Sequence, residues 1–107
     1  MSVEVNDNAD EARYELRKDG ELAGFAEYRL GEGRITFVHT EIDAARRGRG
    51  LAGELARAAL DDAKRRGLEV VPRCSFIAGF IRKHAAEYLP LVVPSLRERL
   101  IGSTGHD

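Results

Sequence analysis

The 107-residue sequence predicts a single α+β domain with an antiparallel meander, a β-α-β crossover that ends in a parallel strand pair, and a C-terminal helix. Residues 12–42 alternate apolar and polar side chains between turn signals, which is typical of half-buried antiparallel strands. Residues 51–66 instead repeat apolar side chains at helical spacing. Residues 68–71 return to a short apolar run, so the order strand, helix, strand predicts a right-handed crossover.

Turn signals divide the first part of the chain into the strands of the meander. Asp19-Gly20 is a strong hairpin signal, and the glycines at 31 and 33 mark the next turn. The polar residues 1–9 are expected to be frayed, with at most a short strand inside them. The expected strands cover residues 3–5, 12–16, 21–30 and 34–42.

A glycine loop links the last meander strand to the long helix. Gly48 and Gly50 allow the chain to turn sharply, because glycine alone adopts positive φ without steric cost. A strand, a glycine loop and a helix N-terminus with free N–H groups together predict an anion site, with a phosphate as the guest. A solvated turn is the alternative. No Gly-Lys-Ser/Thr follows the loop, which excludes a nucleotide P-loop.

The long helix carries charge pairs on its polar face and a glycine at its end. Asp61 with Arg65 and Asp62 with Arg66 have i,i+4 spacing, and Gly67 is expected to terminate the helix. Pro72 stops the following strand, and Ser75 is expected to cap a second helix over 76–83. Residues 87–91 then close a globular part that spans about 10–92. A short basic helix over 95–101 and a frayed tail over 102–107 follow.

Composition limits the function classes. A formal net charge of −1 at pH 7 argues against a nucleic-acid partner. The single cysteine cannot form an internal disulfide, and no apolar run approaches the roughly 20 residues of a membrane span. The N-terminus lacks the regions of a signal peptide. We therefore expect a cytoplasmic protein without a membrane partner, as a monomer or, through exposed strand edges, a weak homodimer.

The residues from Arg47 to Ala52, Arg-Gly-Arg-Gly-Leu-Ala, resemble the acetyl-CoA-binding motif (Gln/Arg)-x-x-Gly-x-(Gly/Ala) of the GNAT acetyltransferase superfamily. More closely, the chain is similar to the minimal, single-domain members of that superfamily. One departure from their pattern is that two alanines separate His84 from Glu87, where the family has His-x-Glu-Tyr. The segments that carry the likeness are Gly24-Phe25-Ala26-Glu27-Tyr28, His39-Thr40-Glu41, the glycine loop, Pro72-x-Cys74 and His84 with Glu87-Tyr88.

This resemblance implies an acetyl-CoA site and no metal. In GNAT folds the pyrophosphate of CoA lies on backbone N–H groups of the glycine loop, and the pantetheine arm runs along the last meander strand where the parallel pair splays. Arginine suits phosphate because its guanidinium forms paired hydrogen bonds. The CoA-binding residues are therefore expected to be Arg46, Arg47, Gly48, Arg49, Gly50, Leu51 and Ala52.

Two polar residues of the last meander strand are candidates for proton transfer. Strict alternation places His39 and Glu41 on the same face as Ile35 and Phe37. An imidazole changes charge near neutral pH, so His39 suits a general base for the acceptor amine, with Glu41 as a second possible base. The alternative is a hydrogen-bonded histidine at the sheet surface and a glutamate that pairs with an arginine.

Cys74 is the third catalytic candidate, at the start of the second helix. Its functional interpretation is a thiolate favoured by the helix N-terminus and Arg73, acting as an acyl acceptor or lining the thioester. The alternative is a small buried apolar side chain. The family likeness, in which the matching cysteine lies near the acetyl group, favours a functional role.

We expect an acetyl-CoA-dependent N-acetyltransferase that moves acetyl to an amine. The chain has only a short polar N-terminus where larger GNAT enzymes build acceptor walls, so an exposed lysine or a terminal amine of a protein or peptide is the expected acceptor. The alternatives are a non-catalytic module that binds CoA or acyl-CoA, and an interaction protein that uses the fold without CoA.

Overall fold

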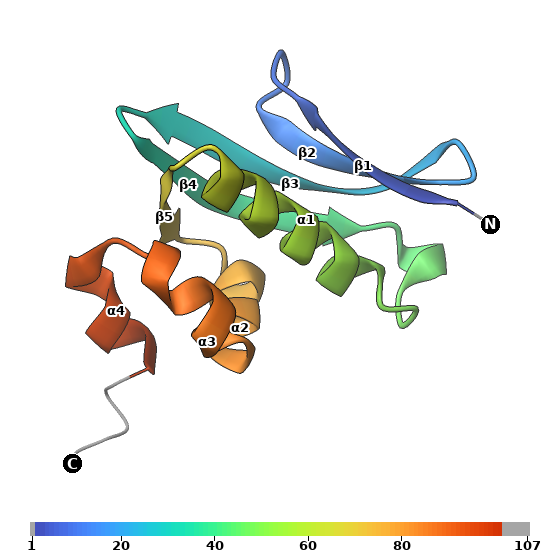
Figure 1. Cartoon of the computed structure of the whole chain (residues 1–107). Coiled ribbons are helices and arrows are strands. Elements are labelled where there is room, and N and C mark those ends of the chain that lie inside the picture. The colour runs from blue at the N-terminus through green and yellow to red at the C-terminus, as the bar shows by residue number, and fades with distance from the viewer. Residues whose placement is uncertain (1, 102–107) are drawn as a thin grey trace.

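The chain forms a five-stranded sheet in the order β1-β2-β3-β4-β5, antiparallel except for the parallel β4–β5 pair. This computed structural model describes residues 2–101 (Figure 1). The predicted α+β class and the crossover are confirmed. The elements are β1 (Val3–Asn8), β2 (Arg13–Lys18), β3 (Glu21–Gly31), β4 (Arg34–Ile42), η1 (Ala44–Arg46), α1 (Leu51–Arg65), β5 (Glu69–Pro72), α2 (Ser75–Lys83), α3 (Ala85–Tyr88), η2 (Leu89–Leu91) and α4 (Pro94–Ile101).

The meander follows its turn residues closely. Asp19 and Gly20 both have positive φ, 50° and 85°, as a type I′ hairpin requires. β1 differs from expectation, because it pairs with β2 along all six residues and is not frayed. Val3 and Val5 pack against the core, and the Tyr28 hydroxyl donates a hydrogen bond to Asp7, which holds this strand in place.

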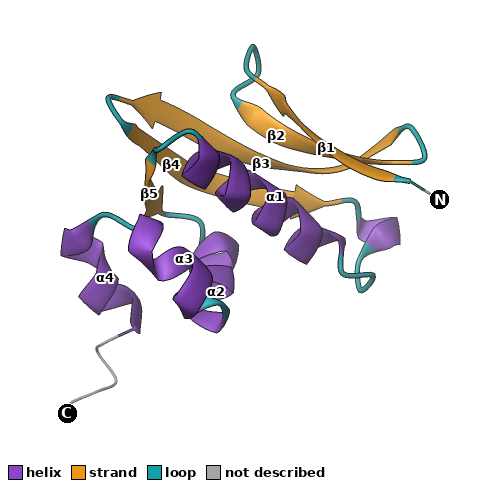
Figure 2. Ribbon diagram, in the orientation of Figure 1, coloured by secondary structure: helices purple, strands orange, loops and turns teal. Residues whose placement is uncertain are grey.

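The helices described here lie on one face of the sheet (Figure 2). The buried stripe of α1 faces the apolar residues of β2, β3 and β4, and α2 packs beside it against β4 and β5. The core therefore lies between one sheet face and one helical layer. Its largest fully buried side chains are Tyr88, Phe37, Leu16, Ile35, Leu55, Leu60, Ile77, Ile81, Val70 and Val92.

Glycines begin and end α1 as predicted. Gly50 is the N-cap at φ 76°, and Gly67 follows the C-cap at φ 70°. The N–H of Gly67 donates to Lys64 O and that of Leu68 donates to Ala63 O, which is a Schellman motif.

One of the two predicted ion pairs on α1 is wrong. Arg66 pairs with Asp62 as expected, but Arg65 also pairs with Asp62 and not with Asp61. Asp61 instead accepts a hydrogen bond from the Tyr88 hydroxyl at 2.7 Å. Asp61 therefore bonds to Tyr88, 27 residues away in the chain, and not to the local Arg65.

The C-terminal part differs from expectation in two places. Cys74 is the N-cap of α2, and Ser75 is already helical and makes no capping bond. The buried core also extends beyond the expected limit at 92, because Val93 is buried and its N–H donates to Val70 O. The predicted short helix near 95–101 is confirmed as α4, whereas the frayed tail expected over 102–107 lies outside the described residues. Within residues 2–101, no helix is long and apolar enough to cross a membrane.

Candidate functional site

The candidate site begins where β4 and β5 separate. The two strands pair from Arg34 with Glu69 as far as Phe37 with Pro72, and the Arg73 N–H then donates to Phe37 O at 3.0 Å. Beyond this point β4 continues to Ile42, whereas β5 has ended and the chain turns into α2. Unequal strand lengths therefore open a groove between the end of β4 and the start of α2.

Three cavities follow one another along this groove. The inner cavity, about 520 Å³, lies against His39 to Ile42 of β4. The loop cavity, about 100 Å³, lies at the glycine loop. The outer cavity, about 760 Å³, lies between the N-terminus of α1 and α2. Ala52 lines all three, and Phe76 lines the inner and outer cavities, so the three adjoin one another.

The glycine loop presents backbone donors to the groove. Gly48 and Gly50 have φ of 82° and 76°, and a Cβ on either would meet no protein atom within 4 Å. Their backbone conformation, not crowding, therefore requires glycine. The first turn of α1 closes with the Glu54 N–H on Gly50 O at 3.2 Å, which leaves the three N–H groups of residues 51–53 without an intrahelical acceptor. Such an end favours an anion.

The three arginines of the loop are not equivalent. Arg46 forms ion pairs with Glu21 and Asp43, so neighbouring carboxylates already balance its charge. The Arg47 Nε donates to Ile42 O at 3.3 Å, and its side chain lines both the inner and the loop cavities. Arg49 is exposed. Arg46 and Arg47 both line the loop cavity, and of these two only Arg47 forms no ion pair within the described residues.

A β-bulge in β4 overturns the predicted strand faces. Glu27 pairs with His39 and Tyr28 pairs with Phe37, so Val38 is an extra residue in β4. Because side chains alternate along a strand, this insertion reverses the faces beyond it. His39 and Glu41 consequently lie on the opposite face from Ile35 and Phe37.

The bulge places the candidate catalytic groups on two sides of β4. His39 Nε2 lies 2.8 Å from Glu41 Oε2, and both side chains are at least half exposed, on the sheet face away from the helices. Thr40 points to the helical side, where its Oγ1 lies 3.2 Å from the buried Cys74 Sγ. The structure therefore brings His39 to Glu41, and Cys74 to Thr40, with the strand between the two pairs.

The backbone of β4 also contributes to the groove. The Asp43 N–H donates to Ala23 O of β3 at 2.7 Å, and backbone groups along a strand alternate in direction. The N–H and C=O groups of Thr40 and Ile42 therefore point away from β3, toward the splay. The Arg47 contact with Ile42 O agrees with this direction.

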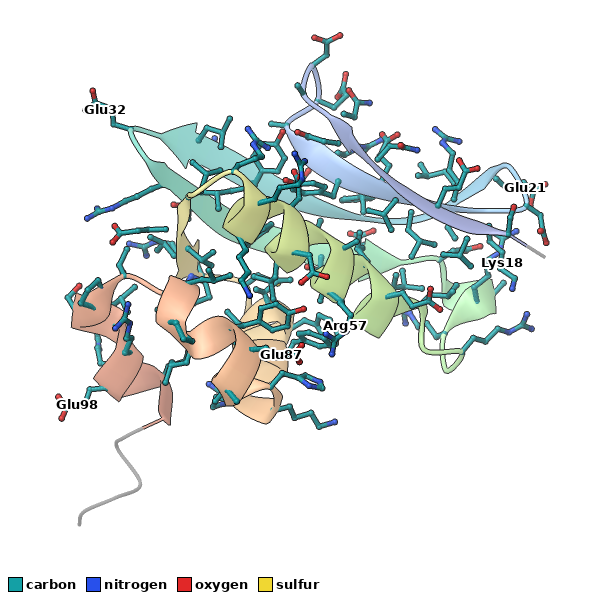
Figure 3. All side chains as sticks on the ribbon, viewed as in Figure 1. Lys18, Glu21, Glu32, Arg57, Glu87 and Glu98 are labelled. Atoms are coloured by element: carbon teal, nitrogen blue, oxygen red, sulfur yellow. The ribbon has the colours of Figure 1, made fainter. Side chains whose placement is uncertain are left out.

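A cluster behind the groove was not apparent from the sequence. Arg57 of α1 donates to Glu87 at 3.0 Å and to the Tyr88 hydroxyl at 3.0 Å, and Figure 3 shows Arg57 and Glu87 meeting between their helices. Burial and the hydrogen bond to Asp61 raise the pKa of Tyr88 to about 12. The hydroxyl is therefore held protonated against α1. Phe80 and His84 connect this cluster to the outer cavity, since the Phe80 ring lies 5.9 Å from that of Tyr88 and His84 Nδ1 lies 3.9 Å from Glu87 Oε1.

No three or more His, Cys, Asp or Glu side chains gather as a possible metal site within residues 2–101.

Comparisons with known proteins found a matching family and a similar solved structure. A family model described as GCN5-related N-acetyl-transferase matches residues 13–91. Among solved structures, a ribosomal-protein-alanine N-acetyltransferase from Brucella melitensis biovar Abortus 2308 is similar, at 23% identity and a TM-score of 0.49. That match covers 58% of this chain and 52% of the other, so it spans about half the length of the solved protein.

Proposed function

The chain belongs to the GCN5-related N-acetyltransferase family, and on this premise we propose that it transfers acetyl from acetyl-CoA to an amine. The proposed acceptor is an exposed lysine or a terminal amine of a protein or peptide. The observation that carries the proposal is the pair of adjoining cavities at the glycine loop and at the splayed edge of β4, where Thr40 lines the inner cavity and contacts Cys74.

The proposed acetyl-CoA lies along the groove with its pyrophosphate at the glycine loop and its thioester at the inner cavity. The pyrophosphate takes the free N–H groups at the start of α1, together with the Arg47 guanidinium. The pantetheine amides pair with the backbone of β4, whose Thr40 and Ile42 groups point to the splay. The acetyl thioester then lies at the level of Thr40 and Cys74.

The acceptor would approach from the sheet face that carries His39. Its nitrogen attacks the acetyl carbon, so a C–N bond forms and an oxyanion develops, which the Thr40 N–H stabilises. His39 takes the proton from the amine, while Glu41, 2.8 Å away, orients the imidazole. The C–S bond then breaks and CoA leaves as the thiolate.

In this mechanism the Cys74 side chain packs beside the thioester and does not react. His39 lines the inner cavity together with Thr40, so it can reach an amine at the edge of β4, where the thioester would lie. The Cys74 sulfur does not line that cavity and contacts the Thr40 hydroxyl on the other side of the strand, so His39 is not placed to activate it as a nucleophile. The acceptor face of the sheet carries no helix in the described part of the chain (Figure 1). An open face of this kind suits an amine on a macromolecule better than an enclosed metabolite.

The test is calorimetric titration with acetyl-CoA, comparing Gly50→Glu with Gly67→Glu. Both glycines have positive φ and open space, at opposite ends of α1. A glutamate is more favourable at a helix N-terminus than at a C-terminus, so Gly50→Glu is expected to be the more stable variant. We expect Gly50→Glu to lose at least about tenfold in affinity, the equivalent of one charge-assisted hydrogen bond, while Gly67→Glu binds like wild type.

A transfer assay on lysine peptides separates the catalytic roles. His39→Gln is expected to lower kcat by about 10²-fold or more without changing the dissociation constant of acetyl-CoA, and Cys74→Ala to retain most activity. An acetyl adduct on Cys74, seen by mass spectrometry, would refute direct transfer. Binding without transfer to any amine would favour a CoA-binding module, and a folded protein without CoA binding would leave an interaction role.

A further inference from the structure

A further cavity, here called the side cavity, lies on the sheet face away from the helices and adjoins the inner cavity. Residues 22–25 of β3 line it together with Glu41 and Asp43, and its volume is about 360 Å³. Phe25 pairs with Glu41 across the β3–β4 ladder, and its ring lies 6.2 Å from that of His39, so this lining belongs to the face that carries the proposed base. Glu41 also lines the inner cavity, so the two cavities meet at this side chain.

The lining of the side cavity combines apolar and acidic side chains. Leu22 is exposed although it is a large apolar residue, and Phe25 is half-buried. Glu41 and Asp43 supply two carboxylates, and no Lys, Arg or His among residues 2–101 lines the cavity. A charged group on a long aliphatic stem suits both parts of this lining, which describes the side chains of lysine and arginine.

Both carboxylates keep one oxygen for such a cation. Glu41 contacts His39 Nε2 through Oε2 alone, at 2.8 Å. Asp43 accepts a hydrogen bond from Arg46 through Oδ2 alone, at 3.1 Å. Glu41 Oε1 and Asp43 Oδ1 therefore have no hydrogen-bond partner among residues 2–101, and an ionised carboxylate accepts at both of its oxygens.

The arginines of the neighbouring strand β2 do not neutralise these carboxylates. Arg13 and Arg17 both pair with Glu15, at 2.8 Å and 3.3 Å. Arg13 also lies over the Phe25 ring, with its guanidinium carbon 4.6 Å from the ring centroid, a contact that aromatic faces make with cations. The side cavity therefore offers negative charge to a cation from outside the chain.

We propose that the side cavity binds a basic side chain close to the acceptor lysine in a protein or peptide substrate. The acceptor amine enters the inner cavity beside His39. The stem of the basic neighbour packs on Leu22 and Phe25, and its charged head lies at Glu41 and Asp43. This assignment rests on the proposed function, because it needs acetyl transfer at the splayed edge of β4. It makes the protein selective for lysines that stand in a basic stretch of sequence.

The test measures kcat/KM for acetyl transfer to peptides with a blocked N-terminus and one acceptor lysine. Each of the two positions on either side of the lysine carries arginine or glutamine in turn, so that charge changes and the number of acceptors does not. The Glu41 and Asp43 side chains are 58% and 45% exposed, and exposed ion pairs are weaker than buried ones. We therefore expect arginine at one or more of these positions to raise kcat/KM by about three- to tenfold, and added salt to reduce this preference.

Two exposed leucines of β3 provide a matched pair of variants. Leu22→Lys adds a cation to the lining of the side cavity, whereas Leu30→Lys makes the same change near the other end of the strand, outside that lining. Both positions are on the surface, so both proteins should fold. Leu22→Lys should lose the preference for arginine, and Leu30→Lys should keep it.

Asp43→Asn provides a second variant that removes one carboxylate and keeps the shape of the side chain. It should reduce the preference for arginine, whereas Asp10→Asn, at an exposed position outside the side cavity, should not. Asp43 also pairs with Arg46 at the loop cavity. The preference compares two acceptors at one acetyl-CoA concentration, so a change in donor affinity cancels in the ratio.

The outcomes separate this assignment from the proposed function. Equal kcat/KM on all peptides, or a preference for arginine that survives in Leu22→Lys, would overturn the role of the side cavity and leave acetyl transfer intact. An equal loss of the preference in Leu22→Lys and Leu30→Lys would also overturn it, because net charge would then explain the effect. No transfer to any of these peptides by the folded wild type would overturn the proposed acceptor and, with it, this assignment.

Discussion

Gly24 is the position where a single methyl group should distort the site from within the sheet. It lies in β3 opposite Ile42 of β4, and its backbone is buried. A Cβ added there would lie 2.5 Å from Ile42 Cδ1 and 2.7 Å from Glu41 O. The first atom ends a flexible side chain, but the second is backbone. Gly24→Ala must therefore push β4 outward at residues 41–42, on the edge of the inner cavity.

The magnitude follows from two opposing effects. Overpacking a buried position costs about 1–3 kcal/mol. Replacing a strand glycine by alanine returns roughly 0.5–1 kcal/mol of backbone entropy. The middle of these ranges gives a net destabilisation of Gly24→Ala of about 1 kcal/mol, or a decrease in the melting temperature of roughly 4–8 °C for a domain of this size.

The assay is urea unfolding followed by circular dichroism, with Gly31→Ala as the matched control. Gly31 ends the same strand, and a Cβ there would meet nothing within 4 Å. This control should lie within about 0.5 kcal/mol of wild type. Because Ile42→Val removes the Cδ1 contact, it should cost less in the Gly24→Ala background than alone, a coupling that a double-mutant cycle measures. A Gly24→Ala protein as stable as the control would refute the reasoning.

Two further predictions concern the pH dependence of stability. Burial and the bond to Asp61 raise the pKa of Tyr88 to about 12, above the ordinary 10.0, so the stability it contributes is complete below pH 10 and is lost as the pH rises through 12. Tyr88→Phe should flatten the alkaline decline of the unfolding free energy, and an unchanged slope would contradict this. The hydrogen bond from Arg13, the largest influence, holds the pKa of Glu15 below 4.5, so its contribution is present above pH 4.5 and is lost as the pH falls through the lower folded-state value. Glu15→Gln should flatten the acid decline in the same assay, and acid sensitivity equal to wild type would count against this ion pair.

Some features of this site can be predicted from the sequence because neighbouring residues determine them. The bounds of β4 at 34 and 42 follow from alternation between glycine turns, and the structure has the same bounds. The positive φ at Gly48, Gly50 and Gly67 follows from residue type at a helix start and end. The family resemblance could be seen for the same reason, since the motif at residues 47–52 is a short local sequence. The family model matches the chain over residues 13–91.

Other features depend on contacts between segments far apart in the chain. The Arg46 guanidinium pairs with Glu21, 25 residues earlier in the chain, a contact that the loop sequence alone does not predict. Val92 and Val93 are buried because they reach β5, although their own segment shows no clear pattern. The aromatic side chains of α2 line the outer cavity only because the N-terminus of α1 lies opposite.

The sequence by itself determined the order of the elements, the glycine loop and the family, because periodicity and glycine conformation are properties of short segments. Only the tertiary structure decided which face of β4 carries His39. The inserted Val38 has no signature of its own: it alternates like its neighbours, and only the pairing with Glu27 and Tyr28 of β3 shows that one residue is unmatched. Register is a property of two strands, and a shift of one residue decides whether the His39 imidazole faces Cys74 or the open side of the sheet.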